Sequence, residues 1–242
     1  AKNKVTINDP DEDIVIFSQE ITYDQNKNVI FTEGFTEARV QNKYNFYSNN
    51  VFYNKQNAEL SSKKKTQVLD DKYNLYELDK FNYSKKEFLL KGENVKIKTN
   101  FNSNINSDEY FFESGFFYLD NRNFNAGNTK ISMQKSIFGN IENDPRLFGV
   151  TSFKEGEITQ VNKGIFTSCK KREGCPPWSI QAQKIIHDKK KKQLIYDNAF
   201  LKVYDFPIVY FPKFFHPDPT VKRQSGLLKP ILNESETLGS SL

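Results

Sequence analysis

The chain has 242 residues, of which 37% are hydrophobic and 14% aromatic, and its formal net charge is +5. This length suits one large domain or two small ones, either able to bury a core. The cations are mostly lysines interleaved with acidic residues, which argues against a nucleic-acid reader. No apolar run reaches the ~20 residues of a membrane-spanning helix. The polar start at Ala1 without a signal peptide indicates a cytosolic protein or a processed or trimmed piece.

Apolar residues alternate with polar ones along most of the chain. The alternating pairs are Ile14/Ile16, Ile21/Tyr23, Tyr44/Phe46, Val51/Tyr53 and Val95/Ile97. A spacing of two indicates strands, and the intervening Asn, Asp and Gly residues indicate turns. No convincing amphipathic helix exceeds two turns. The pattern therefore predicts an all-β chain of about 14 to 18 short strands.

An internal repeat links three tyrosines. Tyr23, Tyr53 and Tyr83 are each separated by 30 residues, and each is followed by a polar turn. Weaker copies of the unit begin near Phe117 and Ile185. Repeats of this length stack on their neighbours to bury an apolar face. We therefore expect a stacked, folded-over antiparallel sheet with these tyrosines in register on successive layers.

Such a stack has open ends, so its aromatic interior suits either of two arrangements. The inward side chains either fill an ordinary core or leave an apolar groove along the stack. The sequence alone leaves both open.

Prolines cluster near the C-terminus and indicate a boundary. Five of the nine prolines fall between Pro207 and Pro230, and proline does not donate to a central β ladder. We expect one domain over 1–205 and an irregular segment over 206–242.

Residues suited to metal binding or catalysis do not form a convincing site. Cys169 and Cys175 have C-x5-C spacing rather than the closer spacing of zinc knuckles, and His187 and His216 lie 29 residues apart. The acidic runs at 11–13 and 108–109 are the best enzymatic alternative, a sugar-cleaving carboxylate pair, but adjacent acids in a strand face opposite sides. We expect no metal, no cofactor and no catalytic residues.

The two cysteines are close enough in sequence to pair. Gly174 and the prolines after Cys175 form a loop that could bring the thiols together. A Cys169–Cys175 disulfide would indicate an oxidising compartment. The alternative is two reduced surface thiols.

Four blocks, read in order, resemble the LptD family of lipopolysaccharide (LPS) assembly proteins of Gram-negative outer membranes. The blocks are Gly164–Cys169, Trp178–Ala182, Pro207–Pro212 and Lys222–Pro230. The resemblance implies an OstA-type β-jellyroll over 1–205, then a hinge and the beginning of an outer-membrane β-barrel over 206–242. It also implies an outer-membrane location on the periplasmic face and no enzymatic activity.

In that family the jellyroll holds LPS acyl chains in its interior. The implied partners are LPS, a periplasmic LPS-bridge protein that stacks on an edge strand, and an outer-membrane lipoprotein plug that acts through the barrel. The resemblance and the alternation together give a lipid-binding groove lined by Ile21, Tyr23, Phe31, Val51, Tyr53, Phe81, Tyr83, Leu89, Val95, Ile97 and Leu119. The implied gate or hinge residues are Pro207, Pro212 and Pro230.

This chain departs from the family pattern in its cysteines. It has none near its start and a second one at Cys175, so a barrel cysteine and Cys175 both remain possible partners of Cys169. Two other functions stay open: a soluble LPS-bridge protein of the same fold, and a β-solenoid with a carbohydrate-active or structural role.

Overall fold

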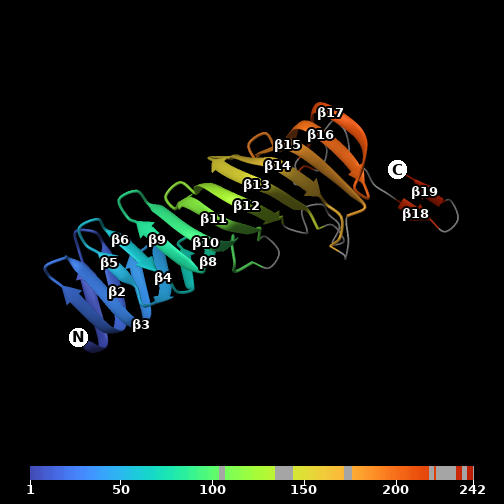
Figure 1. The fold of residues 1–242 in the computed structure, drawn as a ribbon. Coiled ribbons are helices and arrows are strands. Elements are labelled where there is room, and N and C mark those ends of the chain that lie inside the picture. Colours follow the sequence, from blue (N-terminus) through green and yellow to red (C-terminus); the bar gives the residue numbers. More distant parts are fainter. Residues whose placement is uncertain are drawn as a thin grey trace.

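The fold is entirely β in the part of the chain that the structure describes. The computed structural model describes residues 1–103, 107–133, 144–171, 176–217 and 221, and the backbone of 233–235 and 239–241. Its strands stack side by side along one long axis, from β1 at the N-terminal end to β17 (Figure 1). The predicted all-β class is confirmed, and the architecture is β-jellyroll-like. The main sheet has 17 strands.

The bounds of the strands are as follows. They are β1 (Lys2–Asp9), β2 (Ile14–Asp24), β3 (Val29–Val40), β4 (Tyr44–Asn49), β5 (Phe52–Asn54), β6 (Glu59–Ser62), β7 (Thr66–Asp70), β8 (Leu75–Leu78), β9 (Lys80–Ser84), β10 (Leu89–Lys98), β11 (Glu109–Tyr118), β12 (Asn123–Ser132), β13 (Arg146–Glu155), β14 (Ile158–Thr167), β15 (Trp178–Asp188), β16 (Gln193–Val203), β17 (Phe206–Pro217), β18 (Asn233–Ser235) and β19 (Gly239–Ser241).

The sheet folds into two facing walls. At β3 it divides: Val29–Phe31 pairs with β5, whereas Phe35–Val40 pairs with β4. The first wall then runs through β4, β7 and β8, and the second through β5, β6 and β9. β10 pairs with both β8 and β9 and so rejoins the two walls. From β10 to β17 each strand runs across both walls.

Each long strand bends where it passes from one wall to the other. Gly34, Asn94, Asn128 and Asn198 have positive φ at these points, a conformation that glycine and asparagine adopt at low cost. The ladder between β16 and β17 skips from Asp197↔Lys213 to Ala199↔Phe211. Pro212 occupies this gap, where its missing N–H removes no ladder hydrogen bond.

The three repeat tyrosines lie in one row across the second wall. Tyr23 pairs with Ile30, Ile30 with Tyr53, Tyr53 with Leu60 and Leu60 with Tyr83. The tyrosines therefore fall in register on alternate strands, which confirms the prediction from the 30-residue period. We call this the tyrosine row, and it continues through Leu90, Phe117 and Phe124.

The core lies between the two walls and extends along the stack. One cluster of buried apolar side chains spans Ile14 to Ala126, and a second spans Ile131 to Ala199. Tyr110 packs against both clusters. The apolar interior is therefore continuous from β2 to β16.

The expected boundary after residue 205 falls in the turn between β16 and β17. β17 pairs with β16 from Phe206 to Pro217, so this segment continues the jellyroll sheet. Pro207 and Pro212 both lie in β17 with exposed side chains. Pro230 lies outside the described residues.

Candidate functional site

A cleft opens between the free edges of the two walls, near the middle of the stack. Its volume is about 450 Å³. The first wall contributes Tyr76, Ile97 and Tyr110, and the second contributes Phe117, Leu119 and Phe124. We call this cleft the mouth. It gives access to the apolar interior at the point where the two core clusters meet.

Tyr110 is the central aromatic residue of the mouth. Its ring stacks on Phe112 at 6.1 Å and meets Phe124 edge-on at 6.4 Å, both within the range of favourable ring pairs. Burial raises the pKa of the Tyr110 hydroxyl, and Asp108 adds to the shift. The hydroxyl therefore stays neutral, so this junction of the two clusters carries no charge.

Charged side chains surround the mouth. Lys72, Arg122, Lys154 and Lys189 face Asp108, Asp120 and Glu157 around the cleft. An apolar interior beneath a polar, cation-containing rim suits a molecule with apolar chains and an anionic head.

Lys154 is placed unusually for a lysine, because it extends the tyrosine row. It pairs with Phe124 across β12 and β13, at the position that apolar residues occupy on earlier strands. Burial lowers the pKa of Lys154, and repulsion from Lys189 lowers it further. Its Nζ donates to the Arg122 carbonyl oxygen at 3.2 Å. A bound anion would compensate this partly desolvated cation. This position was not predictable from the sequence, since the Phe124–Lys154 pairing depends on long-range register.

The mouth is bridged on its N-terminal side by contacts between the walls. The Tyr44 hydroxyl donates to the Leu119 carbonyl at 2.9 Å, and the Tyr53 hydroxyl donates to Asp9 at 2.8 Å. Lys85 forms an ion pair with Glu12 at 3.1 Å. We call these three contacts the clasp. Each joins residues far apart in sequence, so the clasp holds the walls together beside the mouth.

Most of the predicted lining residues lie in the interior. Eight belong to the buried core between the walls, namely Ile21, Val51, Tyr53, Phe81, Tyr83, Val95, Ile97 and Leu119. Leu89 is also buried, but its neighbour Leu90 takes the position in the core cluster. Whether they contact a lipid stays a prediction.

Tyr23 and Phe31 are corrections to the predicted lining. They are 44% and 49% exposed. Tyr23 lies in the tyrosine row but at its outer end, where its hydroxyl donates to Asn28 at 3.0 Å. Phe31 faces outward because its neighbour Thr32 faces inward. There the Thr32 hydroxyl bonds Thr36 at 2.7 Å.

Cys169 lies beyond β14 and is half-buried against the second core cluster. The Cys169 thiol is 3.7 Å from the Trp178 carbonyl oxygen. The Arg146 guanidinium donates to the backbone carbonyl oxygen of Cys169 at 2.7 Å. Cys175 lies outside the described residues, so the predicted Cys169–Cys175 disulfide stays a prediction. Within the described ranges Cys169 forms no disulfide.

The described residues contain no cluster of three or more His, Cys, Asp or Glu side chains arranged to hold a metal ion. The same part of the chain contains no helix of the length and apolarity needed to cross a membrane.

These features define a class: a β-jellyroll-like protein whose two walls enclose a continuous apolar interior beneath a charged mouth. No protein-family model matches the chain. The chain is similar to LPS-assembly protein LptD of Hahella chejuensis (strain KCTC 2396), with 29% identity over 86 residues, or 36% of this chain. It is also similar to LPS-assembly protein LptD of Legionella pneumophila (strain Paris), with 30% identity over 82 residues, or 34% of this chain.

These matches indicate an LptD-like relationship over about a third of the chain. The matched segments cover 10% and 9% of the two LptD proteins. The chain thus spans about a tenth of the length of the curated relatives it matches.

Proposed function

We propose that this chain binds the acyl chains of LPS between its two walls and passes the lipid along its interior. The observation that carries the proposal is the continuous apolar interior, whose two clusters meet at Tyr110 beneath the mouth. Each CH₂ group moved out of water gains about 0.8 kcal/mol, so a lipid with several acyl chains would bind firmly. The partial similarity to LptD proteins supports LPS as the lipid.

The rim of the mouth suits the head of such a lipid. Arg122, Lys154 and Lys189 line it, and their charges complement phosphate groups. Lys154 faces the interior row, so it would meet a phosphate close to the attached acyl chains. We infer that the head stays at the rim while the acyl chains enter between the walls.

Entry requires the walls to part, because side chains fill the interior. Lateral passage then needs similar sites in series rather than one deep site. The tyrosine row supplies a repeated apolar surface from Ile30 to Phe124. The chain is proposed to act as a conduit and not as an enzyme.

The proposed location is the periplasmic face of the outer membrane. β1 lies at the N-terminal end of the stack (Figure 1), and we propose that a periplasmic LPS-bridge protein stacks on it as an additional strand. LPS would leave toward an outer-membrane barrel and its lipoprotein plug. Pro207, Pro212 and Pro230 are proposed as hinge residues on that side.

A displacement assay tests the proposal. The purified chain is loaded with fluorescent lipid A, and unlabelled lipid A or deacylated LPS is added as competitor. Lipid A should displace the probe at concentrations at least about 100-fold lower than deacylated LPS, because only lipid A has acyl chains to bury. Equal displacement by both would show recognition of the sugars and would contradict the proposal.

A further inference from the structure

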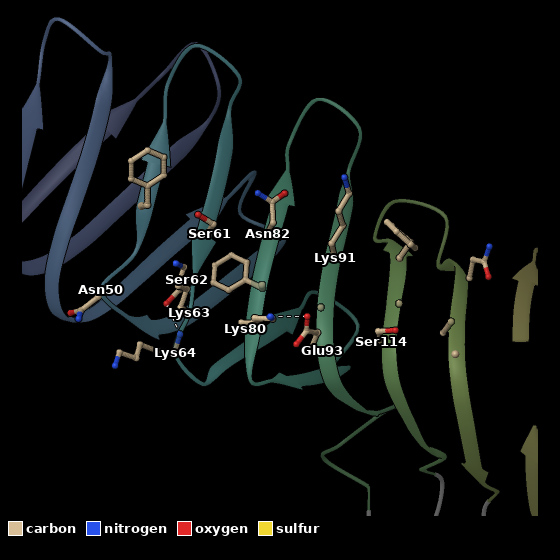
Figure 2. Close-up of a pocket in the computed structure, with 18 of the residues that line it drawn as sticks. Asn50, Ser61, Ser62, Lys63, Lys64, Lys80, Asn82, Lys91, Glu93 and Ser114 are labelled. Carbon is tan, nitrogen blue, oxygen red and sulfur yellow. Dashed lines mark hydrogen bonds and ion pairs between the residues drawn. The ribbon is translucent and has the colours of Figure 1, made fainter. Parts of the chain in front are cut away.

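A second hollow lies on the outer face of the second wall, separate from the mouth. It is a groove of about 900 Å³ that crosses the strands from β5 to β12 and is open to solvent along its side (Figure 2). The groove lies over the outward-facing side chains of these strands, although the buried residues Ser62, Phe81 and Ala126 also line part of it. We call it the outer groove.

One cross-strand row forms the length of the outer groove. Phe52, Ser61, Asn82, Lys91 and Phe116 pair in succession across β5, β6, β9, β10 and β11. Four strand spacings of ~4.8 Å place the two phenylalanines about 19 Å apart. An aromatic ring therefore lies at each end of the row, with small and polar side chains between.

Both ends of the outer groove expose apolar surface. Phe116 is 48% exposed. At the other end Phe31, 49% exposed, meets Phe52 edge-on at 5.9 Å.

The charge of the outer groove is strongly positive. Lys63, Lys64, Lys80 and Lys91 line it together with a single acidic residue, Glu93. Glu93 pairs with Lys80 at 2.7 Å, and Figure 2 shows this pair beside the groove floor. Within the described ranges no carboxylate lies at ion-pair distance from Lys63, Lys64 or Lys91, and Lys91 instead lies 5.8 Å above the Phe116 ring.

We propose that the outer groove binds an extended acidic segment of a partner polypeptide. One apolar side chain of the segment packs on each aromatic end, and its carboxylates lie beside Lys63, Lys64 and Lys91. A six-residue extended peptide spans about 20 Å, which matches the separation of the two ends. The interaction is independent of lipid binding in the interior.

The open side of the outer groove favours a peptide over an acyl chain. A peptide can keep its backbone in water while its anchors and carboxylates contact the groove. An acyl chain lying there would leave much of its apolar surface exposed, whereas the proposed site between the walls would bury it.

The test uses the full 242-residue chain and a fluorescein-labelled hexapeptide with phenylalanine at each end and four acidic residues between. Fluorescence anisotropy gives the Kd at low salt and at 0.3 M salt. The test variant is Lys63→Glu/Lys64→Glu. The matched control is Lys190→Glu/Lys192→Glu, which makes the same charge change in the exposed turn between β15 and β16, away from the lining of the mouth. A peptide with serines in place of the acids controls for apolar binding, and circular dichroism checks that each variant folds.

We expect the test variant to bind the acidic peptide at least about ten-fold more weakly than wild type. The control variant should stay within about two-fold, and salt should weaken wild-type binding. If both variants lost the same affinity for the acidic peptide, binding would depend only on net charge, which would overturn the proposal. Failure of the wild type to bind the peptide would also overturn it. Binding of phosphatidylglycerol vesicles that is lost in the test variant, with peptide binding unchanged, would assign the outer groove to a membrane surface and also overturn it.

Discussion

The Tyr44 hydroxyl on the first wall donates a hydrogen bond to the Leu119 carbonyl on the second, at 2.9 Å and across 75 residues of sequence. The two residues lie at the edge of the mouth, where Leu119 is also part of its lining. This contact is the member of the clasp that lies closest to the mouth lining. Opening the interior to a ligand at this point requires the contact to break.

Replacing Tyr44 with phenylalanine should weaken closure of the mouth. The change removes one largely buried hydrogen bond and keeps the ring, so we expect the free energy of unfolding to fall by about 0.5–1.5 kcal/mol. Lipid A uptake, followed by stopped-flow fluorescence, should become faster. Tyr47→Phe is the matched control, because Tyr47 lies on the same strand with its ring stacked outside against Phe35. Slower uptake in Tyr44→Phe than in wild type would contradict a role in closure.

Two tyrosines of the same row should respond oppositely to removal of the hydroxyl. The Tyr53 hydroxyl donates to the buried Asp9 carboxylate at 2.8 Å. Tyr53→Phe removes this hydrogen bond from a buried carboxylate, so the free energy of unfolding should fall by about 1–3 kcal/mol. Among the described groups none bonds the buried Tyr83 hydroxyl. Tyr83→Phe should therefore leave stability unchanged or raise it by up to about 1 kcal/mol. Urea unfolding of the two variants decides the matter, and equal losses would show that the rings rather than the hydroxyls determine the effect.

Lys154→Met should separate stability from ligand binding. Burial lowers the pKa of Lys154, so its charged form costs stability at neutral pH, and this cost disappears as pH rises through the ordinary pKa of lysine. The variant should therefore unfold at higher urea than wild type at pH 7, and the difference should shrink as pH rises toward the ordinary lysine pKa of ~10.4. Its affinity for lipid A should fall. A variant that gains stability but keeps full affinity would exclude Lys154 from headgroup recognition.

Two glycines, Gly115 in β11 and Gly127 in β12, test how closely side chains pack around these strands. A Cβ on Gly115 would lie 2.6 Å from the Phe117 ring and 2.9 Å from the Ala126 Cβ, whereas at Gly127 the nearest atom is 3.9 Å away. Gly115→Ala should destabilise the fold by about 1–3 kcal/mol through overpacking. Gly127→Ala should be near neutral or slightly stabilising, because it restricts the unfolded chain. Equal urea midpoints for the two variants would contradict this packing.

The tyrosine row was predictable because it depends on a repeat in the sequence itself. A constant 30-residue spacing keeps Tyr23, Tyr53 and Tyr83 in step even though the intervening turns differ. The division of single strands between two walls was not predictable in the same way. The bends at Asn94, Asn128 and Asn198 use asparagines that also occur in ordinary turns, so sequence does not distinguish a bend within a strand from its end.

The inward or outward direction of particular side chains was harder to predict for a related reason. Thr32 takes the interior position because Thr36 bonds its hydroxyl there, and this displaces Phe31 to the surface. Lys154 reaches the interior row only because β12 and β13 pair in one register. Both placements depend on tertiary contacts, which alternation along one strand does not encode.

Site-specific photo-crosslinking tests the central claim most directly. A photoreactive phenylalanine analogue is placed in turn at Tyr110, which joins the two core clusters, and at Phe111, which pairs with the exposed Lys130 on the outer surface. The chain is incubated with LPS and irradiated, and adducts are detected by immunoblotting. Acyl chains held between the walls predict a strong LPS adduct at position 110 and little or none at 111. Equal adducts at both positions, or an adduct at 111 alone, would show that LPS binds the outer surface and would contradict the account.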